Sequence, residues 1–452
     1  MGKRILSILL VLTMVLGLFV GCGNKDVNSD DQTDQEVADK DNTEDEVTDS
    51  EDSDDKEKEE VVLWYLWTGV EGENLEKIVD EFNNNQDKYE VKGLSVPDVQ
   101  KVTVAISSGE GPDITDDFSN NVASYAEKGI MEPLDKYIKD SGYDTSDFVP
   151  AALETCQYND ETYALPIGMN LMMLFYNKQL FKEAGIEEPP KTDEELLDCA
   201  IKLTKVNDDK SIDVLGFPDF PFVYYVNPMS FALGGQFASE DGKTLTPNNE
   251  GTIRALDILV EYREKFGLDN VIKFQSSGKY LDPTDPFISG KQAMRIDGPW
   301  LGHNIKNVIK ADVDYGVVPL PYPEGKPELE KSAEVSSSMF YIPVTAKNKE
   351  GAGEFLSTMG GGEGMKQFNL LNAGLPARLS LLEDSDFEAL EDFEAFADLA
   401  KSPNLKTFPS LPQQAEYQQI IGDQAELAAS LEKSPKEAMD EAAEKAKKLL
   451  EE

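Results

Sequence analysis

Hydrophobic positions from Val61 onward alternate between two patterns. Residues 61–67 (VVLWYLW) form a continuous apolar run, typical of a strand buried on both faces of a parallel sheet. The next apolar residues keep the spacing of a helix that packs on a sheet: Leu75, Ile78, Val79 and Phe82. The chain therefore predicts a strand followed by a helix at the start of its folded part.

The same alternation continues along the chain. Residues 89–96 read as a strand, 99–107 as a helix and 111–115 as the start of a third strand. A further buried strand is expected at 171–178. Strands that alternate with helices predict an α/β fold with mostly parallel sheets.

Two helix starts carry recognisable capping residues. Thr192 is followed three places later by Glu195, which is the pattern of a capping box. Ser434, Pro435 and Glu437 repeat this arrangement near the end of the chain. Helices are therefore expected to begin directly after Thr192 and Ser434.

The N-terminal 21 residues have the layout of a secretory signal peptide. Lys3 and Arg4 precede an apolar stretch, and small residues end it at Gly21 and Gly23. The stretch is at or below the roughly 20 apolar residues that a membrane-spanning helix needs. It ends in FVGC, which resembles a bacterial lipobox, with Phe19 at the place usually held by leucine. Cys22 is the predicted lipidation site, with palmitate among its acyl chains; a plain cleaved signal or an uncleaved anchor are the alternatives.

Residues 22–60 are predicted to form a disordered acidic tether. From 23 to 60 the segment holds 18 Asp or Glu against four Lys, and no aromatic residue. Such a composition cannot bury enough apolar surface to offset chain entropy. A flexible chain of this length spans on the order of 35 Å. The alternative is an acidic tail that only aids solubility.

The length, charge and cysteine content of the chain limit the possible domain organisation, partners and types of site. Residues 61–452 exceed the length at which single cores stop growing, so two lobes are expected. The formal net charge of −45, without a basic block, argues against nucleic acid as a partner. Cys156 and Cys199 are too few for a disulfide scaffold or a cysteine-based metal site.

The residues carry no recognisable catalytic motif. His303 is the only histidine, so any triad or zinc site would depend on one ring. The glycine-rich stretch 360–364 lacks the Lys and Ser/Thr that a phosphate-binding loop needs. We therefore expect a protein that is not an enzyme and that uses no cofactor or metal.

Five stretches, in order, resemble the extracellular solute-binding proteins (family 1) of sugar ABC transporters, the group that contains maltose-binding protein. The longest covers 163–204, and the others are ISSGEGPDI (106–114), FISGKQAMRIDGPW (287–300), YGVVPLP (315–321) and FNLLNAGLPARLS (368–380). The resemblance covers essentially all of 61–452 and agrees with the lipobox, since Gram-positive relatives are lipid-tethered.

The resemblance implies an α/β, two-lobed, periplasmic-binding-protein-like fold (type II) with a hinge and an interlobe ligand cleft. One lobe would be 61–168 plus 316–372, and the other 171–314 plus 376–452. Crossovers would fall near Gly168–Asn170, Tyr315–Val318 and Ala373–Pro376. Gly168, Gly316 and Gly374 would either free the backbone there or serve ordinary turns.

A neutral sugar needs flat aromatic rings and short polar side chains that converge from both lobes. Family positions and strand ends together give the expected ligand-binding set: Trp67, Asp117, Asn120, Asn170, Tyr224, Tyr225, Asn227 and Trp300. Tyr224 and Tyr225 cannot both face one side of an extended chain, so one of them is expected to stack. Asp117 and Asn120 have a second interpretation as helix caps.

The implied function is capture of a carbohydrate, most simply an oligosaccharide, outside the cell and its delivery to an ABC permease. The protein would act as a monomer, held by its lipid at the outer face of the cytoplasmic membrane. Maltose specificity does not carry over, because TGVEGEN (68–74) lacks the Asp-Lys pair of maltose-binding protein and Phe222 replaces an acidic contact. The alternatives are a binder of a charged or non-sugar solute, such as a sugar phosphate or polyamine, and a tethered glycosidase.

Overall fold

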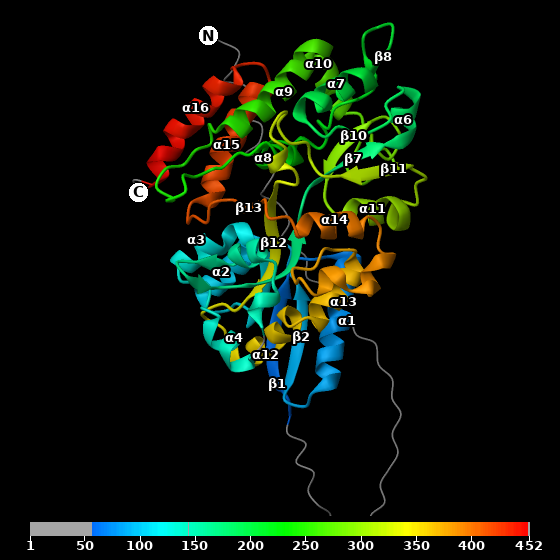
Figure 1. Ribbon diagram of the computed structural model, residues 1–452. Coiled ribbons are helices and arrows are strands. Elements are labelled where there is room, and N and C mark those ends of the chain that lie inside the picture. Colours follow the sequence, from blue (N-terminus) through cyan, green and yellow to red (C-terminus); the bar gives the residue numbers. More distant parts are fainter. Residues whose placement is uncertain (1–56, 143, 451–452) are drawn as a thin grey trace, which may run out of the picture. The chain divides into compact units, whose positions relative to one another are not determined.

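The computed structural model describes residues 57–142 and 144–450 (Figure 1). The part from Glu57 onward forms one compact unit. The predicted signal peptide, Cys22 and nearly all of the predicted tether lie outside the described residues. The first strand begins at Glu59, two residues before the predicted start of the folded part.

The larger sheet has six strands, in the order β13-β12-β3-β1-β2, with β6 also paired to β12. Its strands are β1 Glu59–Tyr65, β2 Tyr89–Ser95, β3 Ile114–Phe118, β6 Leu165–Asn170, β12 Ala333–Tyr341 and β13 Leu405–Thr407. β1 pairs in parallel with both β2 and β3, as its apolar run predicts. β12 runs antiparallel to β3 and β6, so the sheet is mixed.

Helices on this sheet follow from the apolar spacing. In α1 (Gly69–Asn85) the four residues at the predicted helical spacing are all buried. The neighbouring helices are α2 Val99–Ser108, α3 Val122–Glu127, α4 Asp135–Ser141, α5 Pro150–Glu154, α12 Lys349–Gly360 and α13 Glu363–Asn372. A small hairpin, β4 Gln157–Tyr158 and β5 Glu161–Thr162, lies beside them in the chain. The strand and helix boundaries predicted for 89–107 agree with β2 and α2 within one residue.

The second sheet corrects the expectation of mostly parallel pairing. Its order is β10-β7-β11, with β7 Met173–Asn177, β10 Met294–Asp297 and β11 Tyr315–Val318, and both pairings are antiparallel. The buried apolar run at 171–178 located β7 correctly. The run did not predict whether the neighbouring strands are parallel or antiparallel to β7, because burial on both faces makes a strand apolar in either case.

Helices surround the second sheet and fill the upper part of Figure 1. They are α6 Lys178–Glu183, α7 Asp193–Leu203, α8 Val226–Ala232, α9 Glu250–Phe266, α10 Leu268–Gln275, α11 Trp300–His303, α14 Phe393–Ala400, α15 Gln414–Ala429 and α16 Pro435–Ala446, with a hairpin β8 Lys205–Val206 and β9 Ile212–Val214. Both predicted helix starts are confirmed: Thr192 and Glu195 form a complete capping box, and the Ser434 hydroxyl accepts from the Glu437 N–H.

The two sheets and their helices make a two-lobed α/β fold. β11 pairs with β7, so residues 315–318 lie in the second sheet, and the chain joins the first sheet again at β12. The exact division into lobes, which the sequence placed at 168–171, 314–316 and 372–376, stays a prediction.

A buried asparagine of α13 holds this helix against β6. The side-chain amide of Asn369 donates to the carbonyls of Ile167 at 2.7 Å and Met365 at 2.8 Å. A Cβ on Gly374 would lie 2.4 Å from the Asn369 Oδ1, and one on Gly168 would lie 3.2 Å from it. Neither glycine has a positive φ. These glycines therefore serve close approach to Asn369 rather than a left-handed turn.

Asn369→Ala is expected to lower the free energy of unfolding by about 1–3 kcal/mol, because two buried carbonyls lose their donor. Urea titration of the full chain measures it. The exposed Asn307 gives the matched control, and Asn307→Ala should change the value by less than about 0.5 kcal/mol. Equal effects from the two variants would contradict the proposed clamp.

Candidate functional site

A cleft of two adjoining pockets lies where the sheets meet. The larger has a volume of about 450 Å³ and the smaller about 140 Å³. They share four lining residues: Asn170, Met172, Tyr224 and Ser336. Loops that follow strands of both sheets contribute to the lining, as expected for α/β proteins that bind ligands at strand ends.

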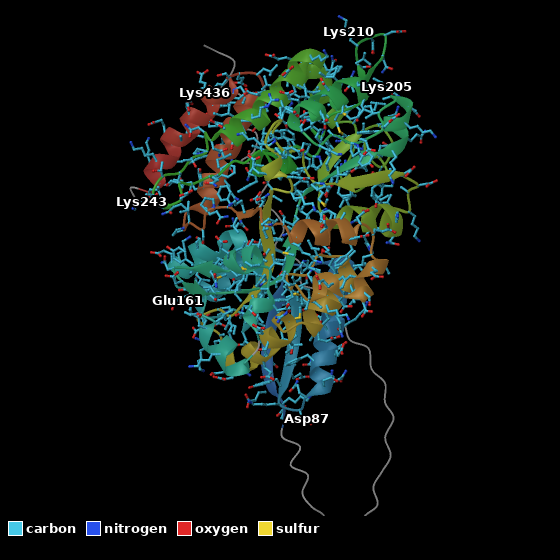
Figure 2. The ribbon with its side chains drawn as sticks, in the orientation of Figure 1. Asp87, Glu161, Lys205, Lys210, Lys243 and Lys436 are labelled. Atoms are coloured by element: carbon cyan, nitrogen blue, oxygen red, sulfur yellow. The ribbon has the colours of Figure 1, made fainter. Side chains whose placement is uncertain are left out.

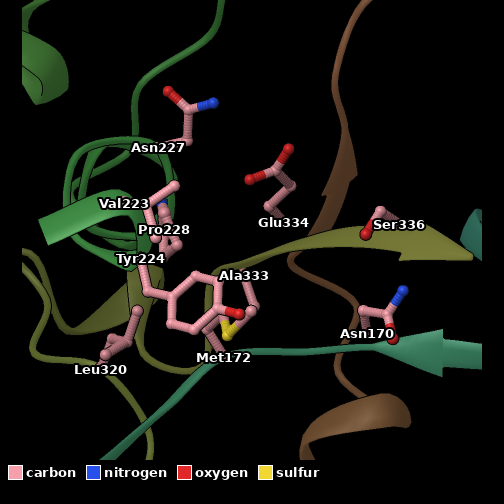
Figure 3. Close-up of a pocket in the computed structure, with 10 residues that line it drawn as sticks. All are labelled: Asn170, Met172, Val223, Tyr224, Asn227, Pro228, Leu320, Ala333, Glu334 and Ser336. Carbon is pink, nitrogen blue, oxygen red and sulfur yellow. The ribbon is translucent and has the colours of Figure 1, made fainter. Parts of the chain in front are cut away.

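Five of the eight predicted ligand-binding residues line this cleft. Trp67, Asn170, Tyr224 and Trp300 line the larger pocket. Asn227 lines the smaller one, together with Asn170 and Tyr224 (Figure 3). The cleft thus brings together aromatic rings and amide side chains that are far apart in the sequence.

Trp67 packs against aromatic side chains in the core of the larger sheet. Its ring lies 4.7 Å from Phe368 and 5.8 Å from Phe340, measured between ring centroids. The Ser95 hydroxyl donates to its backbone carbonyl at 2.7 Å. One face of a half-buried ring is therefore held by the protein, which leaves an aromatic surface on the cleft.

Trp300 is held by a chain of hydrogen bonds. Its indole Nε1–H donates to the Tyr280 hydroxyl at 2.8 Å, and that hydroxyl donates to the Asp297 Oδ1 at 2.8 Å. The ring also folds over Gly298, where a Cβ would lie 2.3 Å from a ring carbon. Tyr224 meets Trp300 edge to face at 6.2 Å between ring centroids. The hydrogen bond and the close packing on Gly298 therefore hold the Trp300 indole in one orientation beside Tyr224.

Buried charges support this chain of hydrogen bonds. The Arg295 guanidinium binds both oxygens of Asp285, at 2.9 and 2.6 Å, and lies 3.9 Å from the Asp297 carboxylate. All three side chains are fully buried. Burial raises the pKa of Asp297 to about 6, with Arg295 opposing that rise. Removing Arg295 would leave two buried carboxylates without their counter-ion, so the support of Asp297 depends on this arginine.

The structure places the other three predicted residues outside the cleft lining. Tyr225 is fully buried, and its hydroxyl donates to the Ala255 carbonyl at 2.9 Å. Asp117 is buried and accepts from the Phe118 N–H and the Asn121 amide. Asn120 lies in the short 3-10 helix that follows β3. Of the adjacent tyrosines only Tyr224 lines the cleft, as expected, but the premise of an extended chain was wrong: Phe222–Tyr224 is a 3-10 helix that leads into α8.

The sequence reasoning missed a polar stripe on β12. Glu334, Ser336 and Ser338 are half-buried, whereas the intervening residues of that strand are buried. Glu334 and Ser336 line the smaller pocket, and Ser336 and Ser338 line the larger one. Polar residues at 334, 336 and 338 were the available signal for one solvent-facing side, and the buried Ser337 between them obscures the period of two. Phe118, 47% exposed and facing the larger pocket, was also missed.

The charged side chains that line the cleft are acidic. No Lys, Arg or His is among the described residues that line either pocket, and the charged residues there are Glu71 and Glu334. Burial raises the pKa of Glu334 to about 7. A site of this kind offers acceptors and repels anions.

Other candidate chemistry lies away from the cleft. His303 belongs to α11 and contacts Asn307 at 3.2 Å. Burial raises the pKa of Cys156 to about 12 and that of Cys199 to about 11, so both thiols stay protonated at neutral pH. Across residues 57–142 and 144–450 no group of three His, Cys, Asp or Glu side chains is arranged to hold a metal ion. Within the same residues no helix is both long and apolar enough to cross a membrane.

Two α/β lobes around a cleft lined by aromatic and polar side chains define a two-lobed solute-binding protein. The chain matches the bacterial extracellular solute-binding proteins over residues 67–366, and it belongs to that family.

Individual relatives are distant. A maltotriose-binding protein of Pyrococcus abyssi is 26% identical over 336 residues, covering 73% of this chain and 69% of that protein. The sn-glycerol-3-phosphate-binding periplasmic protein UgpB of Salmonella typhimurium is 23% identical over 413 residues, covering 86% and 92%. The solved structure of CpMnBP1 with mannobiose bound has a TM-score of 0.73 at 24% identity, covering 86% of this chain and all of that one. The structural likeness confirms the predicted two-lobed fold.

Tyr280→Phe is expected to lower the free energy of unfolding by about 1–3 kcal/mol, because the Trp300 indole loses its acceptor and Asp297 loses a donor. It should also shift the tryptophan emission of the full chain, since Trp300 loses its fixed orientation. Denaturant titration followed by fluorescence measures both. Tyr137→Phe, at a half-buried tyrosine of α4, is the control; an identical profile for the two variants would contradict this role of Tyr280.

Proposed function

We propose that this protein captures a neutral carbohydrate, most simply an oligosaccharide, outside the cell and delivers it to the permease of an ABC importer. One observation carries the proposal: Trp67, Tyr224 and Trp300 line a single cleft together with amide and hydroxyl groups, and no described residue of that lining is basic. Aromatic faces suit the C–H faces of sugar rings, and the polar groups suit their hydroxyls.

Binding in this proposal involves no bond breaking. A sugar that contacts side chains of both sheets favours the closed form only to the extent that it binds that form better than the open one. The segments near Gly168, between β11 and β12, and near Gly374 would carry the motion between the proposed lobes. The closed protein would then be presented to the permease.

The composition of the cleft disfavours a phosphorylated ligand. A phosphate group is normally bound by Arg, Lys or a helix N-terminus. The described lining residues supply Glu71 and Glu334 instead. The relatives that bind sn-glycerol 3-phosphate share the fold, and for this chain we propose a neutral solute.

We further propose that the protein is a monomeric lipoprotein. The lipobox-like FVGC would place the lipid on Cys22, and residues 22–60 would tether the folded part at the outer face of the cytoplasmic membrane. A tethered binding protein can release its sugar to a permease in the same membrane without being lost to the medium.

Trp300→Ala is expected to weaken the binding of the neutral oligosaccharide by about 10- to 100-fold, or about 1.4–2.8 kcal/mol, through loss of a stacking ring. The ligand comes from a thermal-shift screen of the protein against neutral mono- and oligosaccharides, with sn-glycerol 3-phosphate and a polyamine as charged probes. Trp64→Ala, outside the cleft lining, is the control for a lost indole. A melting shift with a charged probe alone would overturn the sugar proposal.

Cys22→Ser is expected to move the protein from the membrane fraction to the medium in a Gram-positive host, because the thiol that carries lipid is absent. Immunoblots of the two fractions and metabolic labelling with a palmitate analogue measure this. Ser29→Ala, within the proposed tether, should leave the distribution unchanged. Labelled protein that remains on the membrane after Cys22→Ser would contradict the proposed anchor.

A further inference from the structure

The smaller pocket contains an acidic side chain without a counter-ion. Glu334 is half-buried on β12, and its carboxylate has no hydrogen bond or ion pair with any described residue. Figure 3 shows its carboxylate and the Asn227 amide in the open space on one side of the Tyr224 ring. A carboxylate in such a place is unfavourable unless something else supplies donors to it.

The backbone around Glu334 fixes where that carboxylate lies. Residues 333–335 pair in parallel with β13, and residues 336–340 pair with β6. Because side chains alternate across a strand, Glu334 shares its face with Ser336 and Ser338. The carboxylate therefore sits at the end of a polar stripe that runs on into the larger pocket.

No ion pair with a described residue neutralises this carboxylate. β6 and α8 contain no titratable side chain, and the titratable groups of β3 and α5, which also pack on β12, are acidic: Asp116, Asp117 and Glu154. In β13 the one charged residue is Lys406, which is the register partner of Glu334 and shares its face; its exposed side chain forms no ion pair with Glu334. Tyr224 is the other titratable group among the residues that line this pocket. The missing partners must come from solvent or from a bound ligand.

A carboxylate accepts hydrogen bonds and donates none, so its natural partners are donor groups without negative charge. Two adjacent sugar hydroxyls can donate to its two oxygens, and the Asn227 amide can both donate to and accept from a neighbouring hydroxyl. A phosphate or carboxylate on the ligand would face an uncompensated like charge.

Building on the proposed function, we propose that the smaller pocket is a subsite for a neutral sugar ring, in which Glu334 binds adjacent hydroxyl groups and excludes anionic sugars. Glu334 is then the specificity-determining residue of the cleft. The aromatic rings of the larger pocket would hold the rest of the oligosaccharide.

The protonation state of Glu334 gives the subsite a pH dependence. Burial raises its pKa in the free protein to about 7. Hydroxyl donors favour the ionised form, so a bound sugar lowers that pKa. Affinity for the sugar is therefore low at pH 5.5 and rises by about tenfold or less per pH unit up to about pH 7. Above that pH it is constant.

The test compares the full-chain protein with Glu334→Gln, which keeps the shape of the side chain and removes its charge. Glu328→Gln, at an exposed position, makes the same charge change outside the cleft. Calorimetry at pH 5.5 and 8.0 measures the Kd for the neutral oligosaccharide found by the screen, with mannobiose and maltotriose included. The same sugar carrying a phosphate, and sn-glycerol 3-phosphate, are the anionic probes.

For Glu334→Gln we expect affinity for the neutral ligand about 10- to 100-fold weaker at pH 8.0, together with a flat pH profile and weaker rejection of the anionic probes. Glu328→Gln should match the wild type. A Kd within twofold of the wild type at pH 8.0 overturns the subsite and leaves the sugar proposal standing. A wild type that binds an anionic probe and no neutral sugar overturns both.

A ligand-free measurement supplies an independent check. An ionised carboxylate that is half-buried without a partner destabilises the folded state, so stability falls as the pH rises from the ordinary glutamate pKa to about 7 and is constant above that. Glu334→Gln should therefore raise the melting temperature most at pH 8.0 and by less at pH 5.5. An equal or lower melting temperature at pH 8.0 would show that the carboxylate has a structural partner and would overturn the proposal.

Discussion

The cleft depends on the backbone pairing of β12. This strand binds β3 and β6 on either side and β13 at its start, so it lies inside the larger sheet rather than at its edge. Its register sets Ser336 opposite Asn170 and Ser338 opposite Phe118, which places two lining residues of β12 beside residues of β6 and β3. A slip of one residue would turn the polar stripe into the core and the apolar residues into the cleft. The polar floor of the site therefore follows from sheet hydrogen bonds before any ligand contact is made.

The aromatic wall is built in a different way, from side chains fixed by side chains. Trp300 is oriented through Tyr280 and Asp297, and the buried Arg295 with Asp285 supports Asp297 from below. Trp67 rests on Phe368 and Phe340. Rings that are already held in place lose little conformational freedom when a sugar stacks on them. The loops carry the binding surface, while the core beneath them provides the rigidity.

The sequence predicted those features that depend on local pattern. The apolar spacing gave β1, α1, β2 and α2, and the capping residues gave the starts of α7 and α16. The antiparallel second sheet could not be predicted, because strand direction depends on pairing between distant segments. The same limit applies to the cleft. Trp300 could be proposed from IDGPW, but its hydrogen bond with Tyr280 depends on tertiary structure that the local sequence does not show. Tyr225 shows the converse, since an aromatic residue beside one that lines the cleft belongs to the core.

The acidity of the chain and the acidity of the cleft have different consequences. A net charge of −45 spread over a surface in salt solution acts weakly over distance, because screening reduces it within about 10 Å. Glu334 acts at contact and in a less polar environment, where one uncompensated charge changes the free energy of the free site itself. A ligand that supplies donors relieves this unfavourable state, and an anion increases it. In this proposal, selection of neutral over anionic ligands arises from the unpartnered Glu334 carboxylate of the free cleft. The same carboxylate makes a neutral ligand bind more tightly to the closed form, which encloses it.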